Sequence, residues 1–134
     1  MIKPYLMFSR ECEEAFQLYL KAFDGELLAM QKYGDMPPNP EFPVAEKDKD
    51  LVLHAHLKLT ENGFIMGSDG SRDLKESPKV CISVELNSED QAIKAWNMLK
   101  EGGNVKMDLQ PTFFSKLHGS VMDKFGVTWM FSVI

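Results

Sequence analysis

The chain has 134 residues, of which 44% are hydrophobic and 26% are charged, and this length and composition are typical of one globular domain. They exclude disordered and fibrous proteins, whose compositions are strongly biased. The net charge is −5 at pH 7 and the basic residues are scattered along the chain. Nucleic acid is therefore not an expected partner, because phosphate binding needs clustered lysines and arginines.

The cysteines and the hydropathy of the chain indicate where the protein resides. Cys12 and Cys81 lie far apart without metal-ligand spacing, so we expect reduced thiols in a reducing compartment. Both lie in apolar surroundings, which favours inert buried thiols over reactive ones. The N-terminus does not resemble a secretion signal, and no apolar run approaches the roughly 20 residues of a membrane span. We therefore predict a soluble cytoplasmic protein with no membrane partner.

The first half of the chain begins with a predicted strand and a predicted helix. Residues 2–8 are mostly apolar and predict a strand, and Pro4 favours an edge position because proline has no N–H to donate. A helix should follow, with Ser9 as its N-cap and Gly25 just after its end. The apolar stripe of this helix is Cys12, Ala15, Phe16, Tyr19, Ala22 and Phe23.

Three strands are predicted after this helix, at residues 26–33, 51–59 and 64–68. The second of them alternates, with Leu53, Ala55, Leu57 and Leu59 on one face and Val52, His54, His56 and Lys58 on the other. Asn62-Gly63 predicts a tight hairpin between the last two strands. Residues 34–50 contain four prolines and form a long loop, which is a solvated excursion, a flap over a pocket or an arm that bridges a dimer.

The second half of the chain repeats this order of elements. Residues 70–79 are polar and form a connection, and residues 80–86 predict a strand. Ser88 and Gln91 predict a capping box for a helix that ends at Gly102-Gly103. The apolar stripe of this helix is Ala92, Ile93, Trp96 and Leu99. Further strands are predicted at residues 105–109, 117–122 and 127–133.

The repeated order predicts a duplicated fold. The interval from Ser9 to Gly25 nearly equals the interval from Ser88 to Gly103, as a duplicated unit would leave it. We predict an α+β fold in which residues 1–134 form a single domain of two βαβββ modules, residues 1–69 and 80–134. Each sheet would have a helix on one face and a free concave face, and the two free faces would enclose a cleft.

Several motifs resemble one known family. They are P-Y-L-x-F at residues 4–8, A-F-x-x-Y in the first helix, L-H-A-x-L at 53–57, I-M-x-S-D at 65–69, the tryptophan-bearing helix that ends in G-G, and Q-x-T-F with D-K-F-G-V-x-W-M near the C-terminus. With these motifs the whole chain resembles the PhnB-like branch of the vicinal-oxygen-chelate superfamily, which includes glyoxalases and bleomycin-resistance proteins. The resemblance implies a cup-shaped mixed sheet and a homodimer. Phe114 stands where the family usually has tryptophan, so an indole N–H donor is absent there.

The resemblance also bears on a metal site, because metal enzymes of the superfamily take one His or Glu ligand from each of several strands. The corresponding positions here are Tyr5 or Leu6, Ser68 or Asp69, Ser83, and Phe131 or Ser132. Only Asp69 is a reasonable ligand, and a divalent cation needs several converging donors, so we expect the standard site to be absent. His54 and His56 project from one face of a strand and are the remaining metal candidates. Hydrogen-bonding pocket or interface histidines, or a solvated strand face, are the alternatives for this pair.

The aromatic and methionine side chains predict either additional core or the lining of an apolar pocket. Met107 and Met130 could add to such a lining, whereas His118 has no partner in the sequence and is assigned to the surface or to a turn. The residues that we expect to contact a ligand are His54, His56, Met66, Ser68, Asp69, Phe113, Phe114, Phe125 and Trp129.

Two functions therefore stay open. The first is a small-molecule-binding protein that holds an organic ligand without a cofactor and without the standard metal site. The second is a metal-dependent lyase, isomerase or dioxygenase, in which His54 and His56 help to hold a divalent ion that chelates vicinal oxygens of the substrate. The missing standard ligands favour the first. The family is also described as a demethylubiquinone methyltransferase, but the chain has no G-x-G-x-x-G after a strand and so predicts no nucleotide-type cofactor.

Overall fold

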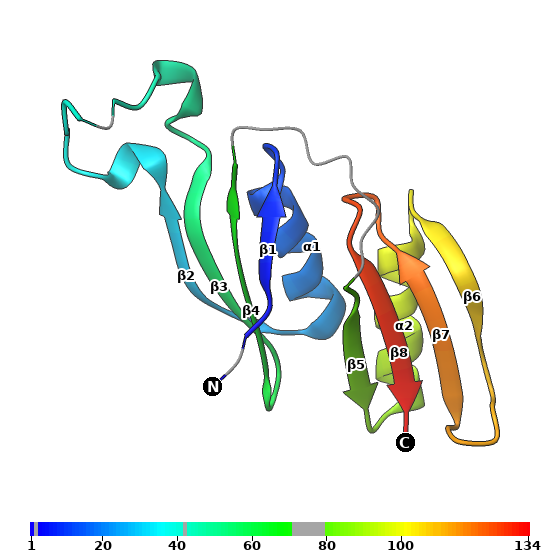
Figure 1. The fold of residues 1–134 in the computed structure, drawn as a ribbon. Coiled ribbons are helices and arrows are strands. Elements are labelled where there is room, and N and C mark those ends of the chain that lie inside the picture. Colours follow the sequence, from blue (N-terminus) through cyan, green and yellow to red (C-terminus); the bar gives the residue numbers. More distant parts are fainter. Residues whose placement is uncertain (2, 42, 71–79) are drawn as a thin grey trace. The chain divides into compact units, whose positions relative to one another are not determined.

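The computed structural model describes residues 1, 3–41, 43–70 and 80–134, and the chain divides into two compact units, Met1–Leu74 and Lys75–Ile134 (Figure 1). Each unit contains a four-stranded mixed sheet and one α-helix. Three predicted segments lie partly outside the described residues: residues 71–79 of the connection predicted at 70–79, residue 2 of the strand predicted at 2–8, and residue 42 of the loop predicted at 34–50. That the two units form a single domain stays a prediction.

The first unit has the order strand, helix and three strands. Its elements are β1 (Tyr5–Phe8), α1 (Cys12–Phe23), β2 (Glu26–Lys32), β3 (Val52–Thr60) and β4 (Gly63–Asp69). The strand order is β1-β4-β3-β2, with β1 parallel to β4 and the other neighbours antiparallel. The loop between β2 and β3 contains two short 3-10 helices, Tyr33–Asp35 and Glu46–Asp48.

The second unit has the same topology. Its elements are β5 (Ile82–Leu86), α2 (Glu89–Lys100), β6 (Asn104–Gln110), β7 (Leu117–Met122) and β8 (Thr128–Val133). The strand order is β5-β8-β7-β6, again with one parallel pair, β5 and β8. The α+β fold class and the two βαβββ modules are thus confirmed.

The first helix begins differently from the prediction. Its N-cap residue is Glu11, not Ser9, and the Glu11 side chain makes no capping hydrogen bond. Instead, the backbone N–H of Cys12 donates to the Asp69 carboxylate over 2.9 Å, so the group that stabilises the helix start comes from β4. At the other end, Asp24 adopts the left-handed conformation (φ 52°) and the N–H of Gly25 donates to the Leu20 carbonyl, which confirms the predicted stop.

The second helix begins as predicted, because the Ser88 hydroxyl accepts a hydrogen bond from the Gln91 N–H over 3.2 Å. Its predicted apolar stripe is wrong at one position. Ile93 is 43% exposed, and Ala95 is buried in its place. The buried residues Ala92, Ala95, Trp96 and Leu99 follow the spacing i, i+3, i+4, i+7, which Ile93 does not share. All six residues of the predicted α1 stripe are buried.

Strand β3 alternates as predicted from Ala55 to Leu59, with the odd-numbered residues buried under α1. The predicted alternation is wrong at Val52. It was placed on the face of His54 and His56, yet it is buried like the residues of the other face. The register of β2 against β3 shifts between Gln31 and Lys32, so β3 contains an extra residue at this point. A β-bulge of this kind changes the face on which the following side chain lies.

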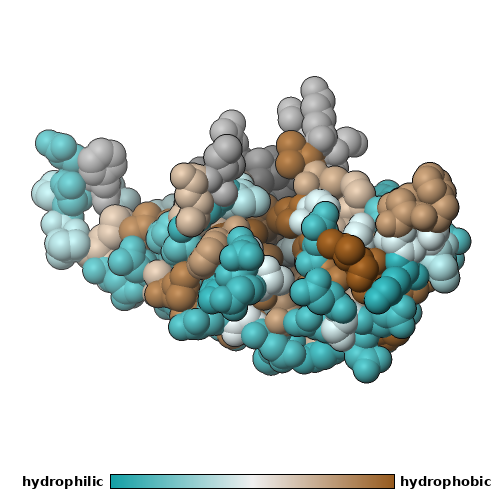
Figure 2. Space-filling view, turned by 90° about the horizontal axis from the view of Figure 1, so that it is seen from below, coloured by the Kyte–Doolittle hydropathy of each residue, from teal (hydrophilic) through white to brown (hydrophobic). Residues whose placement is uncertain are grey.

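Most of the polar residues lie on the surface. The space-filling view shows apolar residues interspersed among hydrophilic ones over one side of the molecule (Figure 2).

Cys12 is buried as predicted, whereas the prediction for Cys81 is wrong, because this residue precedes β5 and is exposed. Neither of the two described α-helices is long and apolar enough to cross a membrane.

Candidate functional site

One face of the first sheet is not covered by α1. This helix packs on the face that contains Ala55, Leu57 and Ile65. Successive side chains of a strand point to opposite faces, so the residues next to these three point away from α1. The register places His56 and Tyr5 next to Met66 on that side. We call this group the open-face cluster, and it consists of Lys3, Tyr5, Met7, His54, His56, Phe64, Met66 and Ser68.

The rings of the open-face cluster form a continuous row. Tyr5 stacks on His54 with ring centroids 6.2 Å apart. His54 lies 6.5 Å from His56, and His56 lies 5.8 Å from Phe64. At the side of this row, the Ser68 hydroxyl donates to the Met7 sulfur over 3.6 Å. The face therefore combines flat apolar surfaces with imidazole and hydroxyl groups, the mixture found in small-molecule sites.

Lys3 is the charged member of the cluster. Its ammonium nitrogen lies 2.9 Å from Nε2 of His56 and 5.1 Å from the centroid of the Phe64 ring. An ammonium group has only donors, so Nε2 of His56 is the acceptor and the proton of the neutral ring resides on Nδ1. Burial lowers the pKa of His56 below its ordinary value of 6.5, and the positive charges of Lys3 and His54 lower this pKa further. His56 is consequently neutral at pH 7.

The structure thus brings together four of the predicted ligand contacts, namely His54, His56, Met66 and Ser68. The prediction of ligand contacts missed Lys3, Tyr5, Met7 and Phe64. The alternation of β1 and β4 could have indicated Tyr5, Met7 and Phe64. Tyr5 and Met7 pair with Met66 and Ser68, and Phe64 lies two residues before Met66 on the same face of β4. Lys3 precedes β1, and no local pattern indicates its position.

Asp69 has a structural role. It is 2% exposed, and its two carboxylate oxygens accept hydrogen bonds from the backbone N–H groups of Cys12 and Val52, each over 2.9 Å. The carboxylate therefore joins the start of α1 to the start of β3. Burial, followed by the negative charges of Asp69 and Glu13, raises the pKa of the Cys12 thiol to about 12, so this thiol is unreactive at neutral pH.

The predicted aromatic contacts of the second unit lie before β7, between β7 and β8, and in β8. Phe113 and Phe114 precede β7 and pack edge to face, with centroids 5.2 Å apart. Phe125 lies between β7 and β8, and Trp129 is the second residue of β8. Trp129 is fully buried and its indole N–H donates to the Asp123 carboxylate over 2.9 Å, which is the core role that the sequence left open. The other oxygen of Asp123 accepts from the backbone N–H groups of Phe125 and Val127.

His118 lies within β7 and not in a turn. Its Nδ1 atom is 3.0 Å from the Ser132 hydroxyl, and its ring packs against Phe114 with centroids 5.0 Å apart. His118, Ser132 and Phe114 form a second, smaller group of aromatic and polar side chains, on the sheet of the second unit.

A divalent metal ion does not fit the described residues well. The described part of the chain contains no group of three His, Cys, Asp or Glu side chains that could hold a metal ion. His54 and His56 supply two imidazoles, whereas a zinc-type site needs about four ligands. The Lys3 ammonium also lies at Nε2 of His56, where it would repel a cation.

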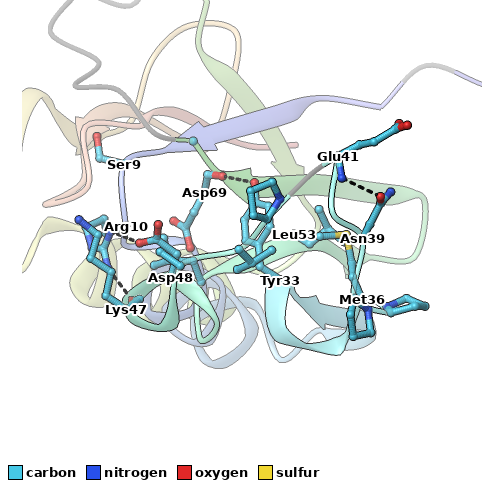
Figure 3. A pocket seen from close by; sticks show the side chains of 17 residues that line it. Ser9, Arg10, Tyr33, Met36, Asn39, Glu41, Lys47, Asp48, Leu53 and Asp69 are labelled. Carbon is cyan, nitrogen blue, oxygen red and sulfur yellow. Dashed lines mark hydrogen bonds and ion pairs between the residues drawn. The ribbon is translucent and has the colours of Figure 1, made fainter.

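The proline-rich loop between β2 and β3 lines a cavity of about 1340 Å³ within the first unit (Figure 3). Arg10 donates to the Asp48 carboxylate and to the Lys47 carbonyl, and the Tyr33 hydroxyl donates to the Asp69 carbonyl over 3.0 Å. These contacts attach the loop to the ends of β1 and β4. Of the alternatives left open by the sequence, they favour a flap over a pocket.

The family can be decided by comparison with known proteins. The model of the 3-demethylubiquinone-9 3-methyltransferase family matches residues 1–132. The chain belongs to this family. Its fold is the glyoxalase/bleomycin-resistance-like fold, which the resemblance had implied. The fosfomycin resistance protein FosX from Mesorhizobium loti shares this fold, with a TM-score of 0.64 over 100% of this chain and 90% of that chain, although only 9% of the residues are identical.

Nearer relatives of this chain come from several bacteria. Protein PA1353 from Pseudomonas aeruginosa is 37% identical with a TM-score of 0.84, covering 99% of this chain and 96% of that chain. The putative 3-demethylubiquinone-9 3-methyltransferase, PhnB protein, from Bacillus cereus is 26% identical with a TM-score of 0.79, covering 99% and 98%. Protein YjdN from Escherichia coli (strain K12) is 29% identical over 99% of this chain and 95% of its own length.

Proposed function

We propose that the protein binds a small amphipathic organic molecule on the open face of the first sheet, without the standard metal site of the superfamily. The observation that carries this proposal is the row of rings from Tyr5 to Phe64, with imidazole nitrogens and a lysine ammonium along it. Aromatic rings and methionines offer apolar contact, and a few polar groups fix the orientation of a ligand.

The second candidate function is a metal-dependent lyase, isomerase or dioxygenase. Among the described residues, the His54–His56 pair favours it, and the lysine beside His56 opposes it. Elemental analysis of protein purified without a histidine tag distinguishes the two functions. Stoichiometric metal that is lost in His54→Ala would support the enzyme and contradict the binding-only role.

The family description names a methyltransferase. The chain has no G-x-G-x-x-G segment between a strand and a helix, so methyl transfer gains no support from a nucleotide-binding loop.

The exposed pair Phe113 and Phe114 fits either of two proposed roles, a ligand contact or burial against a second copy of the chain in a homodimer.

A thermal-shift screen of small organic molecules tests the binding role. A ligand that binds only the folded state adds about 2.7 kcal/mol to stability at about 100 times its Kd. We expect ligands that raise the Tm of the wild-type protein and lose this effect in His54→Ala and in Phe64→Ala. Ile93→Ala, which removes an exposed side chain of α2, serves as the control and should keep the effect. Ligands that stabilise all four proteins equally would place the site elsewhere.

A further inference from the structure

We propose that the ligand of the open face is an organic anion, an aromatic or similarly flat molecule with a carboxylate group, and that Lys3 binds the carboxylate. This inference rests on the proposed function and adds the chemical class of the ligand. It comes from the charge, the free hydrogen-bonding groups and the ring geometry of the open-face cluster.

The charge of this face is the first argument. The protein has a net charge of −5, yet the open face contains Lys3 as well as Lys58, beside which Glu26 is paired. Lys58 lies 3.9 Å from the Glu61 carboxylate. Lys3, by contrast, makes no ion pair with any described residue, and its contacts are an imidazole and a phenyl ring. A positive charge without a counter-ion in an acidic protein favours the binding of an anion.

Free donors are the second argument. An ammonium group has three N–H donors, and within the described structure Lys3 uses one of them, on His56. His54 makes only ring contacts with described residues, so its ring nitrogens are also available. A carboxylate at this position would accept charge-assisted hydrogen bonds, which are about twice as strong as neutral ones.

The position of Lys3 is defined by the backbone. The carbonyl of the next residue, Pro4, accepts a hydrogen bond from the Met66 N–H over 3.0 Å, which extends the pairing of β1 with β4 by one residue. The Lys3 side chain therefore starts beside β4 and reaches across Phe64 to His56. The ammonium lies at one end of the row of rings, so an anion bound there would have its apolar part against Phe64, Met66 and Tyr5.

Titrations with benzoate and benzamide test the inference, because these probes have nearly the same shape and only benzoate is charged. We follow the chemical shifts of the wild-type protein and expect benzoate to bind at least about tenfold more tightly than benzamide, which corresponds to about 1.4 kcal/mol. The shifts should be largest for His54, His56 and their neighbours. Added salt should weaken benzoate binding and leave benzamide binding nearly unchanged.

Three lysine variants identify the residue that binds the carboxylate. Lys3→Met keeps an unbranched apolar side chain but has no charge, and we expect it to bind benzoate about as weakly as benzamide. Lys58→Met removes one positive charge from the same face and should bind benzoate within about twofold of wild type, because Lys58 has its own acidic partner. Lys3→Arg should restore most of the preference for benzoate. The amide spectrum of each variant shows whether it is folded.

The outcomes separate the inference from the proposed function. If both probes bind the open face equally, or if Lys3→Met keeps the preference for benzoate, the inference is wrong while the binding role stands. If neither probe binds, this face does not accept aromatic carboxylates, and the inference is again wrong. The binding role itself is then decided by the thermal-shift screen.

Discussion

Two buried aspartates, Asp69 and Asp123, show how strongly the role of a residue depends on its partners. Both are about 2% exposed, and each uses its two carboxylate oxygens to bind N–H groups of the same unit. Asp69 was a candidate ligand contact because it stands at a position that corresponds to a metal ligand in enzymes of the superfamily. Its partner Cys12 is 57 residues away in the sequence, so no local pattern indicates this hydrogen bond.

His56 should make the stability of the protein depend on pH. The folded state lowers the pKa of His56 below 6.5, so the unfolded chain binds this proton more readily. Stability is therefore unaffected by this group at high pH and decreases as the pH falls through about 6.5 towards the lower folded-state pKa. His56→Gln keeps an acceptor for Lys3 but does not titrate, and its free energy of unfolding should fall less steeply between about pH 7.5 and pH 5.

Urea unfolding at a series of pH values measures this difference. Lys3→Met removes the second cause of the pKa shift, and its pH dependence should lie between those of the wild type and His56→Gln. Identical slopes for the wild type and His56→Gln would contradict the assignment.

At the scale of the elements, the two helices begin by different means. The start of α2 was predictable, because Ser88 and the N–H that it caps are three residues apart. The start of α1 was not, because its cap comes from β4. The strands were predicted to within a few residues, and the register shift beside Val52 was missed because a bulge depends on the partner strand.

The packing of α1 on β4 yields a prediction for Gly67. A Cβ atom at this position would lie 2.9 Å from Cζ of Phe16 and 2.9 Å from the Leu6 carbonyl oxygen, closer than atoms pack. Gly67→Ala should therefore destabilise the protein by about 2 kcal/mol, the typical cost of overpacking a core. Chemical denaturation measures the change.

Gly70→Ala is the matched control for Gly67→Ala. A Cβ atom at Gly70 would meet only ordinary contacts, the nearest at 3.5 Å, so this variant should be close to the wild type in stability. Equal stability of the two variants would show that α1 does not approach β4 as closely as the structure indicates.

At the scale of the whole molecule, the main prediction is the homodimer that the resemblance implies. Phe113 is fully exposed and Phe114 is 59% exposed within one chain, and large exposed aromatic side chains are enriched at protein interfaces. We expect light scattering at micromolar concentration to give twice the mass of the 15.2 kDa chain. The mass of one chain over the whole concentration range would contradict the homodimer.

The sequence by itself determined the order of the elements, their duplication, the buried stripe of α1 and the family. These features depend on residues a few positions apart, whose spacing follows the periods of helices and strands. Only the tertiary structure decided that Asp69 caps a helix, that Trp129 belongs to the core and that Lys3 lies against His56. Lys3 and His56 are separated by 53 residues, and such contacts depend on which strands pair and in which register.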